Sequence, residues 1–428
     1  MKALIALQCD LCVLKWISFV LKTLFGYSLH SGSVKEKKRS EEDYNVCVHR
    51  SNILYGAKRT DAGIAGYNAF LLSHDRYESP VCLRDDSVSL FEFTETHAMF
   101  IVTEPGLDVY NSELSPFVYN TQFIYGKQLL TISMKHFMRF AAELRDPKSH
   151  VILLSNIGRC GSTLLTQMME AVPNTVTMSE PEVLSLVMPS MFRRAPKFCQ
   201  DNQAKLVGMA LKVQCKEIQS RKVDYIIIKP RSFFICQTDL VAKECPYIRH
   251  VFLHRAPRKN ISSFMAMVAS FSYLFHKFVF SMWIEVMFDT LKDSSEYYPM
   301  AQDMKCSLQK NPDSLKVFAA YYAMHISSFL ECRSKHGVDF HVVSYEELVL
   351  NPRQEMKKLL DHCKMPLDNI QGSIEAMEKD SQRNSIFSKD NHKSSRPKEF
   401  NDAQVQTINH ILGQFGLPEL DKYREAFK

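Results

Sequence analysis

The sequence predicts an α/β protein built around a parallel sheet. Short apolar runs of strand length alternate with stretches of helical spacing; the runs are Val151–Ser155, Tyr225–Lys229, His250–His254 and Phe340–Ser344. Continuous apolar runs of this kind are typical of buried parallel strands. The first run also passes through a glycine-containing loop, NIGRCGST, into an apolar helical pattern. We therefore expect a doubly wound sheet that binds ligands at the carboxyl ends of its strands.

Length, composition and charge are those of an ordinary globular protein. The chain has 428 residues, 46% hydrophobic and 23% charged, which suits two or three domains or one large α/β domain with additions. The formal net charge of +6 is mild, and the dense basic cluster at Lys35–Arg39 is typical of a solvated linker. Nucleic-acid-binding proteins usually show basic runs interleaved with aromatic residues. We expect an anionic small ligand and no nucleic acid.

Twelve cysteines are scattered without the spacing of a disulfide framework. Those in apolar contexts, among them Cys236, Cys245 and Cys332, are expected to be reduced and buried. Cys9 and Cys12 form a CxxC pair, but no second ligand pair follows them, which argues against a metal or redox centre.

The organisation along the chain is expected to begin with an apolar or amphipathic segment at residues 1–30. The apolar stretch 3–25 is interrupted by charges. It is therefore consistent with an interfacial or packed helix, with a poor signal anchor, or with neither of the two. A linker over 31–50 and an N-terminal extension over 51–145 follow. The extension has strand-like runs, a helix near 131–145 and no evident chemistry. The main domain is expected over 150–425.

Within the main domain, residues 261–335 are expected to be mostly helical, with a Phe- and Met-rich stripe that is typical of core. Residues 376–400 are polar. The last helix is expected to begin near Asn401-Asp402, because both residues are good helix caps.

The loop after the first strand predicts an anion site. A helix expected from about Leu164 presents unpaired N–H groups and the positive end of its dipole. Gly158 and Gly161 let the backbone approach a phosphate, Ser162 and Thr163 add hydroxyl donors, and Arg159 adds a forked cation. The loop lacks the lysine of the usual triphosphate loop.

Two further segments follow strand candidates. In HVFLHRAPRKNISSF, Arg255 ends a strand and Ser263 lies in the next helical turn, so both can reach one phosphate. The sequon Asn260-Ile261-Ser262 lies in this ligand loop, and we give glycosylation there little weight. In VVSYEELVLNP, Tyr345 and Glu346 follow a strand, with no catalytic role evident from the residues alone.

These three segments, in this order, resemble the sulfotransferase family over about residues 150–365. That resemblance implies a P-loop NTPase-like three-layer sandwich and transfer of a sulfuryl group from 3′-phosphoadenosine 5′-phosphosulfate (PAPS) to a hydroxyl. The loop Gly158–Leu164, with Cys160 inside it, is similar to the family's 5′-phosphosulfate loop, and Arg255 and Ser263 match its 3′-phosphate segment. Arginine at 159 is similar to the Golgi carbohydrate and tyrosylprotein branches.

The resemblance also bears on the general base. The tyrosylprotein branch uses a glutamate in a segment similar to AVPNTVTMSEPEVL, which matches Glu180, 21 residues after Arg159. Glu182 is the competing carboxylate, and a helix-capping role for Glu180 is the alternative. Lys229, at a strand end, is expected to touch the sulfuryl group or the acceptor, unless it is an ordinary exposed lysine. His254 is expected either to pack in the protein interior or to have a function in the site.

The expected activity is therefore a PAPS-dependent sulfotransferase that needs no metal. Its catalytic candidates are Arg159, Glu180 and Lys229. The alternatives are a non-catalytic binding protein with this fold and another P-loop kinase or NTPase. The family's C-terminal glycine-rich basic loop has no clear copy, and the polar stretch with Ser385, Lys389 and Arg396 is its candidate replacement. We expect a Golgi membrane location, with membrane association through the N-terminal segment; a cytoplasmic location is the alternative.

Overall fold

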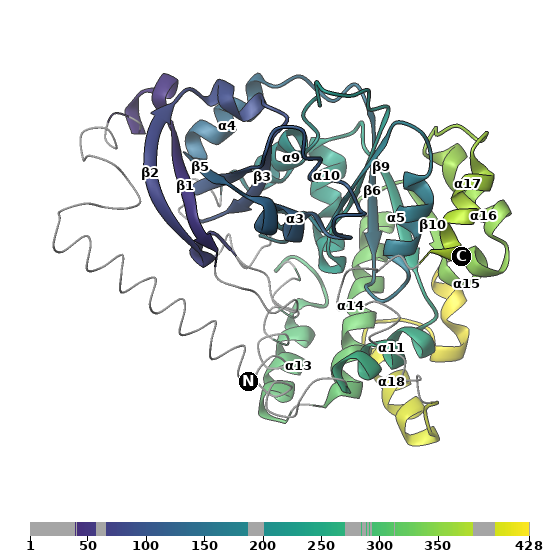
Figure 1. Cartoon of the computed structure of the whole chain (residues 1–428). Coiled ribbons are helices and arrows are strands. Elements are labelled where there is room, and N and C mark those ends of the chain that lie inside the picture. Colours follow the sequence, from purple (N-terminus) through teal and green to yellow (C-terminus); the bar gives the residue numbers. More distant parts are fainter. Residues whose placement is uncertain are drawn as a thin grey trace.

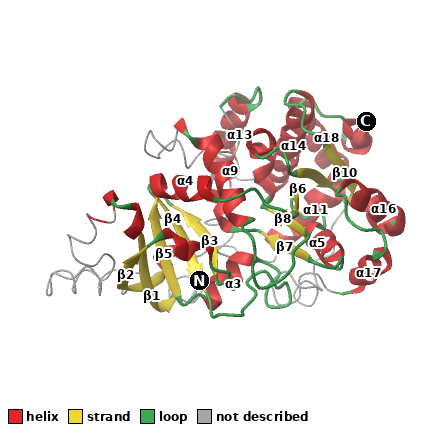
Figure 2. Cartoon of the chain, turned by 90° about the horizontal axis from the view of Figure 1, so that it is seen from above, coloured by secondary structure: helices red, strands yellow, loops and turns green. Residues whose placement is uncertain are grey.

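The computed structural model describes residues 39, 41–56, 66–186, 201–269, 284, 288, 291, 293–311, 313–379 and 399–427. These residues form two five-stranded sheets with helices around them (Figure 1). The first sheet is antiparallel and the second is parallel. Figure 2 shows the antiparallel strands gathered at one side of the molecule and the parallel sheet, with most of the helices, at the other.

The parallel sheet confirms the predicted fold class. Its strands follow the order β10-β9-β6-β8-β7 and all pair in parallel. Their bounds are β6 His150–Asn156, β7 Thr175–Ser179, β8 Tyr225–Lys229, β9 Arg249–His254 and β10 Phe340–Ser344. The four expected strands are present, and a fifth strand, β7, ends directly before Glu180.

Helices on both faces complete three layers around the parallel sheet. The described α-helices of both parts of the molecule are α3 Val118–Tyr125, α4 Met134–Glu143, α5 Ser162–Glu170, α6 Glu182–Leu186, α9 Gln203–Gln214, α10 Thr238–Glu244, α11 Pro257–Ala269, α13 Tyr298–Lys310, α14 Ser314–Ser334, α15 Tyr345–Leu350, α16 Pro352–His362, α17 Ile370–Glu375 and α18 Asp402–Gln414. Because successive strand side chains point to opposite faces, Ile152 and Leu154 share one buried cluster with α5, α14 and α18. Val151 and Leu153 belong to a second cluster with α4 and α9.

The N-terminal sheet follows the order β2-β1-β5-β4-β3. Its strands are β1 Val48–Gly56, β2 Phe70–Glu78, β3 Val88–Phe93, β4 His97–Val102 and β5 Gln128–Ser133. Two predicted boundaries are corrected here. The linker expected to reach residue 50 ends earlier, because β1 begins at Val48. The helix expected from 131 begins at Met134, because 131–133 belong to β5 and the Ser133 hydroxyl caps α4.

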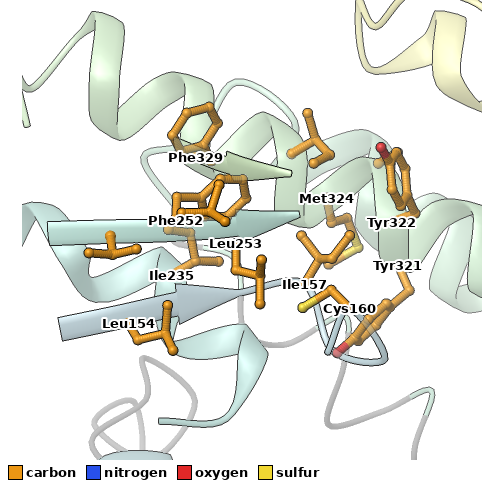
Figure 3. Close-up of a cluster of buried hydrophobic side chains, with 14 of the residues drawn as sticks. Leu154, Ile157, Cys160, Ile235, Phe252, Leu253, Tyr321, Tyr322, Met324 and Phe329 are labelled. Carbon is orange, nitrogen blue, oxygen red and sulfur yellow. The ribbon is translucent and has the colours of Figure 1, made fainter. Parts of the chain in front are cut away.

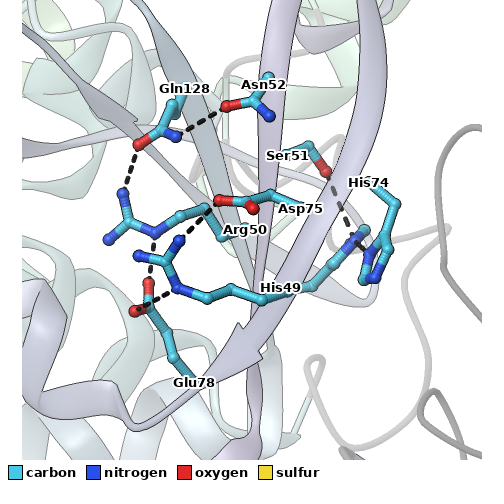
Figure 4. Close-up of polar contacts among 9 residues, drawn as sticks. His49, Arg50, Ser51, Asn52, His74, Asp75, Glu78 and Gln128 are labelled. Atoms are coloured by element: carbon cyan, nitrogen blue, oxygen red, sulfur yellow. Dashed lines mark hydrogen bonds and ion pairs between the residues drawn. The ribbon is translucent and has the colours of Figure 1, made fainter.

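A polar network fastens three strands of this sheet (Figure 4). Arg50 of β1, 9% exposed, donates to Glu78 of β2 and to Gln128 of β5. Gln128 in turn donates to Asn52 at 2.7 Å. Buried charge is tolerated when it is paired and hydrogen-bonded in this way. The network therefore ties strands that are distant in sequence.

The two sheets share one core. A single buried cluster contains Phe100 and Phe137 of the N-terminal part together with Leu153, Met178 and Ile228 of the parallel sheet. The N-terminal part is therefore packed against the parallel sheet.

The C-terminal helix begins as expected. Asn401 is the N-cap of α18, and a capping box joins its side chain to the backbone of Gln404 and the Gln404 side chain to the Asn401 backbone. Cys236, Cys245 and Cys332 are buried, as predicted. Cys9, Cys12 and the segment 3–25 lie outside the described residues. No helix within the described part of the chain is long and apolar enough to cross a bilayer.

Candidate active site

The turn between β6 and α5 has the backbone of an anion-binding loop. Gly158, Arg159 and Gly161 all have positive φ, of 66°, 47° and 86°. Gly161 is the N-cap of α5, so the helix begins at Ser162, two residues before the expected start. The N–H groups of the first helical turn thus lie at the carboxyl end of the sheet, where they favour an anion.

Two asparagines hold this loop, and neither was predicted to do so. The Asn156 side chain accepts a hydrogen bond from the Gly158 N–H at 2.9 Å and donates to the Pro230 carbonyl at 3.2 Å. Asn260, which is fully buried, donates to the Gly158 carbonyl at 2.8 Å. The loop is therefore fixed to the segment after β8 and to α11. Because the Asn260 amide is buried and engaged, it is a poor acceptor for a glycan.

The structure brings together the two segments that were predicted to grip one nucleotide. Arg159 Nε donates to Ser263 Oγ at 3.3 Å, and Arg255 Nη1 donates to the Arg159 carbonyl at 3.1 Å. Burial, and next the charge of Arg255, lower the pKa of Arg159, although a guanidinium stays protonated in proteins. Arg255 Nε is buried without a hydrogen-bond partner among the described residues. The guanidinium groups of Arg159 and Arg255 therefore lie close together and repel each other. A bound anion would offset this repulsion.

The third segment shapes the same place, although no role for it was evident from its residues. The Tyr345 ring lies under Arg255, whose guanidinium carbon is 4.7 Å from the ring centroid. A Cβ at Gly161 would lie 2.5 Å from atoms of this ring. The Glu346 carboxylate accepts the Ala256 N–H at 3.2 and 3.3 Å. The segment therefore positions the turn that carries Arg255.

The loop side chains divide into two kinds. Cys160 is fully buried in the core, where burial raises the pKa of its thiol to about 11, and Figure 3 shows it beside Ile157 and Tyr321. Leu164 packs against the same cluster. The Cys160 side chain therefore cannot face a ligand, and only its backbone can do so. Ser162 and Thr163 are partly exposed, as side-chain donors must be.

Glu180 and Lys229 form a close pair at the ends of neighbouring strands. Lys229 Nζ lies 2.8 Å from Glu180 Oε1, and the Glu180 N–H donates to the Lys229 carbonyl at 2.7 Å. The alternative of an ordinary exposed lysine is wrong, because Lys229 is only 1% exposed. Glu180 has a φ of 52°, a left-handed conformation that costs a non-glycine residue about 1–2 kcal/mol. Strain of this kind is often found at functional sites.

Arg231, which was not predicted from the sequence, completes this cluster. Its guanidinium lies 3.8 Å from Glu180 Oε2 and 3.4 Å from Glu182 Oε2. Burial alone would raise the pKa of Glu180, but Lys229 and Arg231 together outweigh it and lower that pKa. The Glu182 side chain is 5% exposed and that of Glu180 23%. The position of Arg231, two residues after a strand-end lysine, was the available signal.

The N-terminal part contributes to the site, although no chemistry was expected there. The Phe117 ring centroid lies 5.2 Å from Lys229 Nζ, and the Tyr119 ring centroid lies 5.2 Å from the guanidinium carbon of Arg231. Cations favour the faces of aromatic rings. Residues 117–119 therefore cover the cluster of Glu180, Lys229 and Arg231. No local pattern could have shown this, because the contacts span more than a hundred residues.

His254 packs rather than facing the site. It is 4% exposed, its ring stacks on Phe427 with a centroid distance of 3.7 Å, and burial lowers its pKa to about 3. Ser385, Lys389 and Arg396 lie outside the described residues. Within the described ranges, no group of three or more His, Cys, Asp and Glu side chains is arranged to hold a metal ion.

Comparison with models of protein families identifies the family of this chain. A model of the sulfotransferase family matches residues 156–369, half of the chain, and this segment contains the loop, the Glu180 cluster and the Arg255 segment. No curated protein sequence matches the chain.

Solved structures similar to this chain include two sulfotransferases. The sulfotransferase domain of the Synechococcus olefin synthase is 15% identical, with 64% of this chain and 96% of that chain covered and a TM-score of 0.33. Mouse sulfotransferase SULT7A1, solved in complex with 3′-phosphoadenosine 5′-phosphate (PAP), is 11% identical. The match covers 69% of this chain and 96% of that chain, with a TM-score of 0.34. The assignment rests on the family match over residues 156–369: the chain belongs to the sulfotransferase family.

Proposed function

We propose that this sulfotransferase takes a sulfuryl group from PAPS and transfers it to a hydroxyl of its acceptor. The observation that carries the proposal is the convergence of two clusters at one edge of the sheet. Arg159, Arg255 and Ser263 meet at the loop after β6, while Glu180 and Lys229 meet at the ends of β7 and β8. The first cluster suits a nucleotide with two anionic groups, and the second suits proton transfer from a hydroxyl.

The loop would hold the donor. The N–H groups from Arg159 to Leu164 and the hydroxyls of Ser162 and Thr163 would bind the 5′-phosphate. Arg159 would stabilise charge on the bridging oxygen and the sulfuryl oxygens. Arg255 and Ser263 would bind the 3′-phosphate. Fixed donors and cations aimed at developing charge are the largest source of catalysis in transfers of this kind.

Glu180 would act as the general base, with Lys229 as its partner. Its lowered pKa keeps the carboxylate ionised at neutral pH, so it can accept the proton of the acceptor hydroxyl. An acceptor hydroxyl inserted between the two groups would lengthen their ion pair and let burial raise the pKa of Glu180 toward that of a useful base. The freed ammonium of Lys229 could then neutralise a sulfuryl oxygen.

Glu182 is less suited to this task than Glu180. It lies in the first turn of α6, is only 4% exposed, and has Arg231 3.4 Å from its carboxylate. The alternative of a kinase or NTPase would need a metal-binding carboxylate at the strand ends, and none is found at the ends of β8 and β9. A Mg²⁺-binding carboxylate would be needed beside the loop, whereas the residues at the ends of β8 and β9 are Lys229 and, one residue later, Arg255.

We also propose a Golgi membrane location, with residues 3–25 associating with the bilayer. The apolar stretch and the arginine-type loop support this proposal. The test is microscopy of the full chain fused at its C-terminus to a fluorescent protein, compared with a variant that lacks residues 3–25. Golgi staining that needs this segment would support the proposal, and diffuse cytoplasmic signal from the full chain would reject it.

The donor site is tested by calorimetry with 3′-phosphoadenosine 5′-phosphate (PAP) and a metal chelator. We expect wild type to bind PAP without metal. Arg255→Ala should lose about 1.5–3 kcal/mol of binding free energy, the usual range for a hydrogen bond to a charged group, and Arg159→Ala a similar amount. The matched control is Arg333→Ala, an exposed arginine in α14, which should bind like wild type. Absence of PAP binding in folded wild type, or binding only of ATP with Mg²⁺, would reject the proposal.

A further inference from the structure

A short 3₁₀ helix after α18, Leu420–Phe427, is anchored to the core at both of its ends, and we call it the strap. Leu420 is 2% exposed, and its N–H donates to the side-chain oxygen of Asn409 in α18 at 2.9 Å. Ala426 and Phe427, at the other end, pack against the same buried cluster as Leu420. Because a 3₁₀ helix of this length has little stability of its own, contacts with the rest of the protein fix its position.

The first contact between the strap and the donor site is made through His254. This residue ends β9 and directly precedes Arg255, the residue proposed to bind the 3′-phosphate. Its ring stacks on Phe427 with a centroid distance of 3.7 Å and an interplanar angle of 12°, and the Tyr423 ring meets it edge-on at 6.3 Å. Burial, and next the charge of Arg424, lower the pKa of His254 to about 3, so the ring is neutral at pH 7 and packs as an apolar surface. Two rings of the strap therefore fix the residue next to Arg255.

Two ion pairs hold the strap to the elements on either side of this turn. The Asp421 carboxylate accepts from Nη2 of Arg258, in the first turn of α11, at 3.1 and 3.4 Å. Nη2 of Arg424 lies 3.3 Å from Oε1 of Glu347, in the first turn of α15. Exposed ion pairs of this kind add little stability by themselves. Because they join the strap to two different helices, however, they determine where it lies between α11 and α15.

The contacts of the strap converge on the backbone of Arg255. The residue before Arg255 stacks on the strap. The N–H of the residue after it, Ala256, is accepted by Glu346, which is the neighbour of the strap-bound Glu347. The buried Nε of Arg255 has no hydrogen-bond partner among the described residues, so it can donate to a ligand. Because hydrogen bonds from a guanidinium to a phosphate are directional, their strength depends on how this backbone is held.

We propose that the strap positions Arg255 and thereby increases the affinity of the donor site for the 3′-phosphate. This inference rests on the proposed function, because it concerns the nucleotide of that reaction. Phe427, Asp421 and Arg424 are positioning residues, since each acts through a residue of β9, α11 or α15 and not on the nucleotide itself. Loss of the strap contacts should therefore weaken binding of the 3′-phosphate and leave binding of the 5′-phosphate at the loop after β6 intact.

The first experiment compares two nucleotides by calorimetry: PAP, and adenosine 5′-phosphate, which lacks only the 3′-phosphate. Phe427→Ala removes the ring stacked on His254, so it should weaken PAP binding about tenfold and change the Kd for adenosine 5′-phosphate by less than about twofold. Leu308→Ala, which truncates a 3%-exposed residue of α13 in the same buried cluster, is the matched control for lost packing. It should lower the Tm and leave both Kd values unchanged.

The second experiment separates positioning from charge, with substitutions on the surface of the strap that leave the core intact. Asp421→Asn removes a negative charge, so electrostatics alone would tighten binding of the anionic nucleotide, whereas loss of the pair with Arg258 should weaken PAP about threefold. Arg424→Gln should have a similar effect. Lys422→Gln is the matched control, because the Lys422 side chain is 62% exposed and pairs only 3.0 Å away with Glu419, next to the strap. It should bind PAP like wild type.

The third experiment asks whether the strap acts through Arg255. In an Arg255→Ala background, Phe427→Ala should change the Kd for PAP by less than about twofold, because the group that the strap positions is already gone, whereas independent effects would multiply.

Three results would overturn the proposal: tighter PAP binding in Asp421→Asn, equal weakening of both nucleotides or of neither by Phe427→Ala, and multiplied losses in the double variant. Failure of wild type to bind PAP at all would reject the proposed function itself, so the two failures are distinguishable.

Discussion

Glu180 is the residue whose chemistry depends most on its neighbours. A buried carboxyl tends to stay protonated, but Lys229 and Arg231 reverse this tendency and lower its pKa. Because the folded-state pKa lies below the ordinary value of 4.5, the pair stabilises the fold above that value, and the stabilisation is lost as the pH falls through the lowered pKa. The acid limb of the wild-type activity profile should therefore lie below pH 4.5, wherever unfolding does not intervene.

Lys229→Met should move that limb. The substitution removes the nearest cation and keeps the burial, so the pKa of Glu180 should rise and the acid limb of kcat/KM should shift to higher pH. The measurement is sulfate transfer as a function of pH, with a folding check at each point. Lys212→Met is the control. Lys212 lies on α9 and pairs with Asp146, so its substitution should leave the limb in place. A limb that stays at the wild-type pH in active Lys229→Met would show that Glu180 is not the base.

At the scale of elements, the turn from β6 into α5 depends on Gly161. Its φ of 86° is unfavourable for any side chain, and a Cβ would overlap the Tyr345 ring at 2.5 Å. Both the close approach of Tyr345 and the left-handed N-cap therefore require glycine at position 161. Asn156 and Asn260 then hold the turn from two other elements.

Gly161→Ala should weaken the donor site more than the fold. The backbone strain alone is about 1–2 kcal/mol, and relieving it would displace the first turn of α5 and Tyr345. We expect PAP to bind about tenfold or more weakly by calorimetry, while circular dichroism remains that of wild type. Gly413→Ala in α18 is the matched control, because its Cβ would meet nothing within 4 Å, and alanine there should stabilise the helix slightly. Wild-type PAP affinity in Gly161→Ala would contradict this account of the turn.

For the whole molecule, the two sheets behave as one structural unit. The expected division at residues 145–150 crosses a continuous core in which Phe137 of α4 lies with Leu153 and Ile228 of the parallel sheet. The N-terminal part also places Phe117 against Lys229, and several of residues 109–118 line a cavity beside α5 and β7. Loss of its packing should therefore affect both stability and the site.

Phe137→Ala tests this unity. Phe137 is fully buried, and removal of such a ring typically costs 3–5 kcal/mol of the free energy of unfolding. We expect unfolding in urea to remain a single transition at a lower midpoint, whether followed by circular dichroism or by PAP binding. Tyr55→Ala on β1, where the side chain is 43% exposed, should change stability by less than about 0.5 kcal/mol. A loss of structure in Phe137→Ala that leaves the PAP-binding transition unmoved would indicate two independent domains.

The sequence by itself determined the parallel sheet, its loop and the residues that follow its strands. This was possible because the signals are local: apolar runs of strand length, a glycine-containing turn before a helix, and Arg255 directly after β9. Arg159, Glu180, Lys229 and Ser263 could be named for the same reason, with the family resemblance. The start of α5 was misplaced by two residues, because the left-handed N-cap at Gly161 is a backbone property that residue types only hint at.

Only the tertiary structure decided how these residues act together. The burial of Lys229 against Glu180, the addition of Arg231 and the cover by Phe117 and Tyr119 all join segments that lie far apart in sequence. A cavity of about 870 Å³ likewise forms only where α5, β7, residues 109–118 and residues 376–379 meet. Packing of this kind depends on which faces of distant elements come into contact, and periodicity within one element carries no record of its partner.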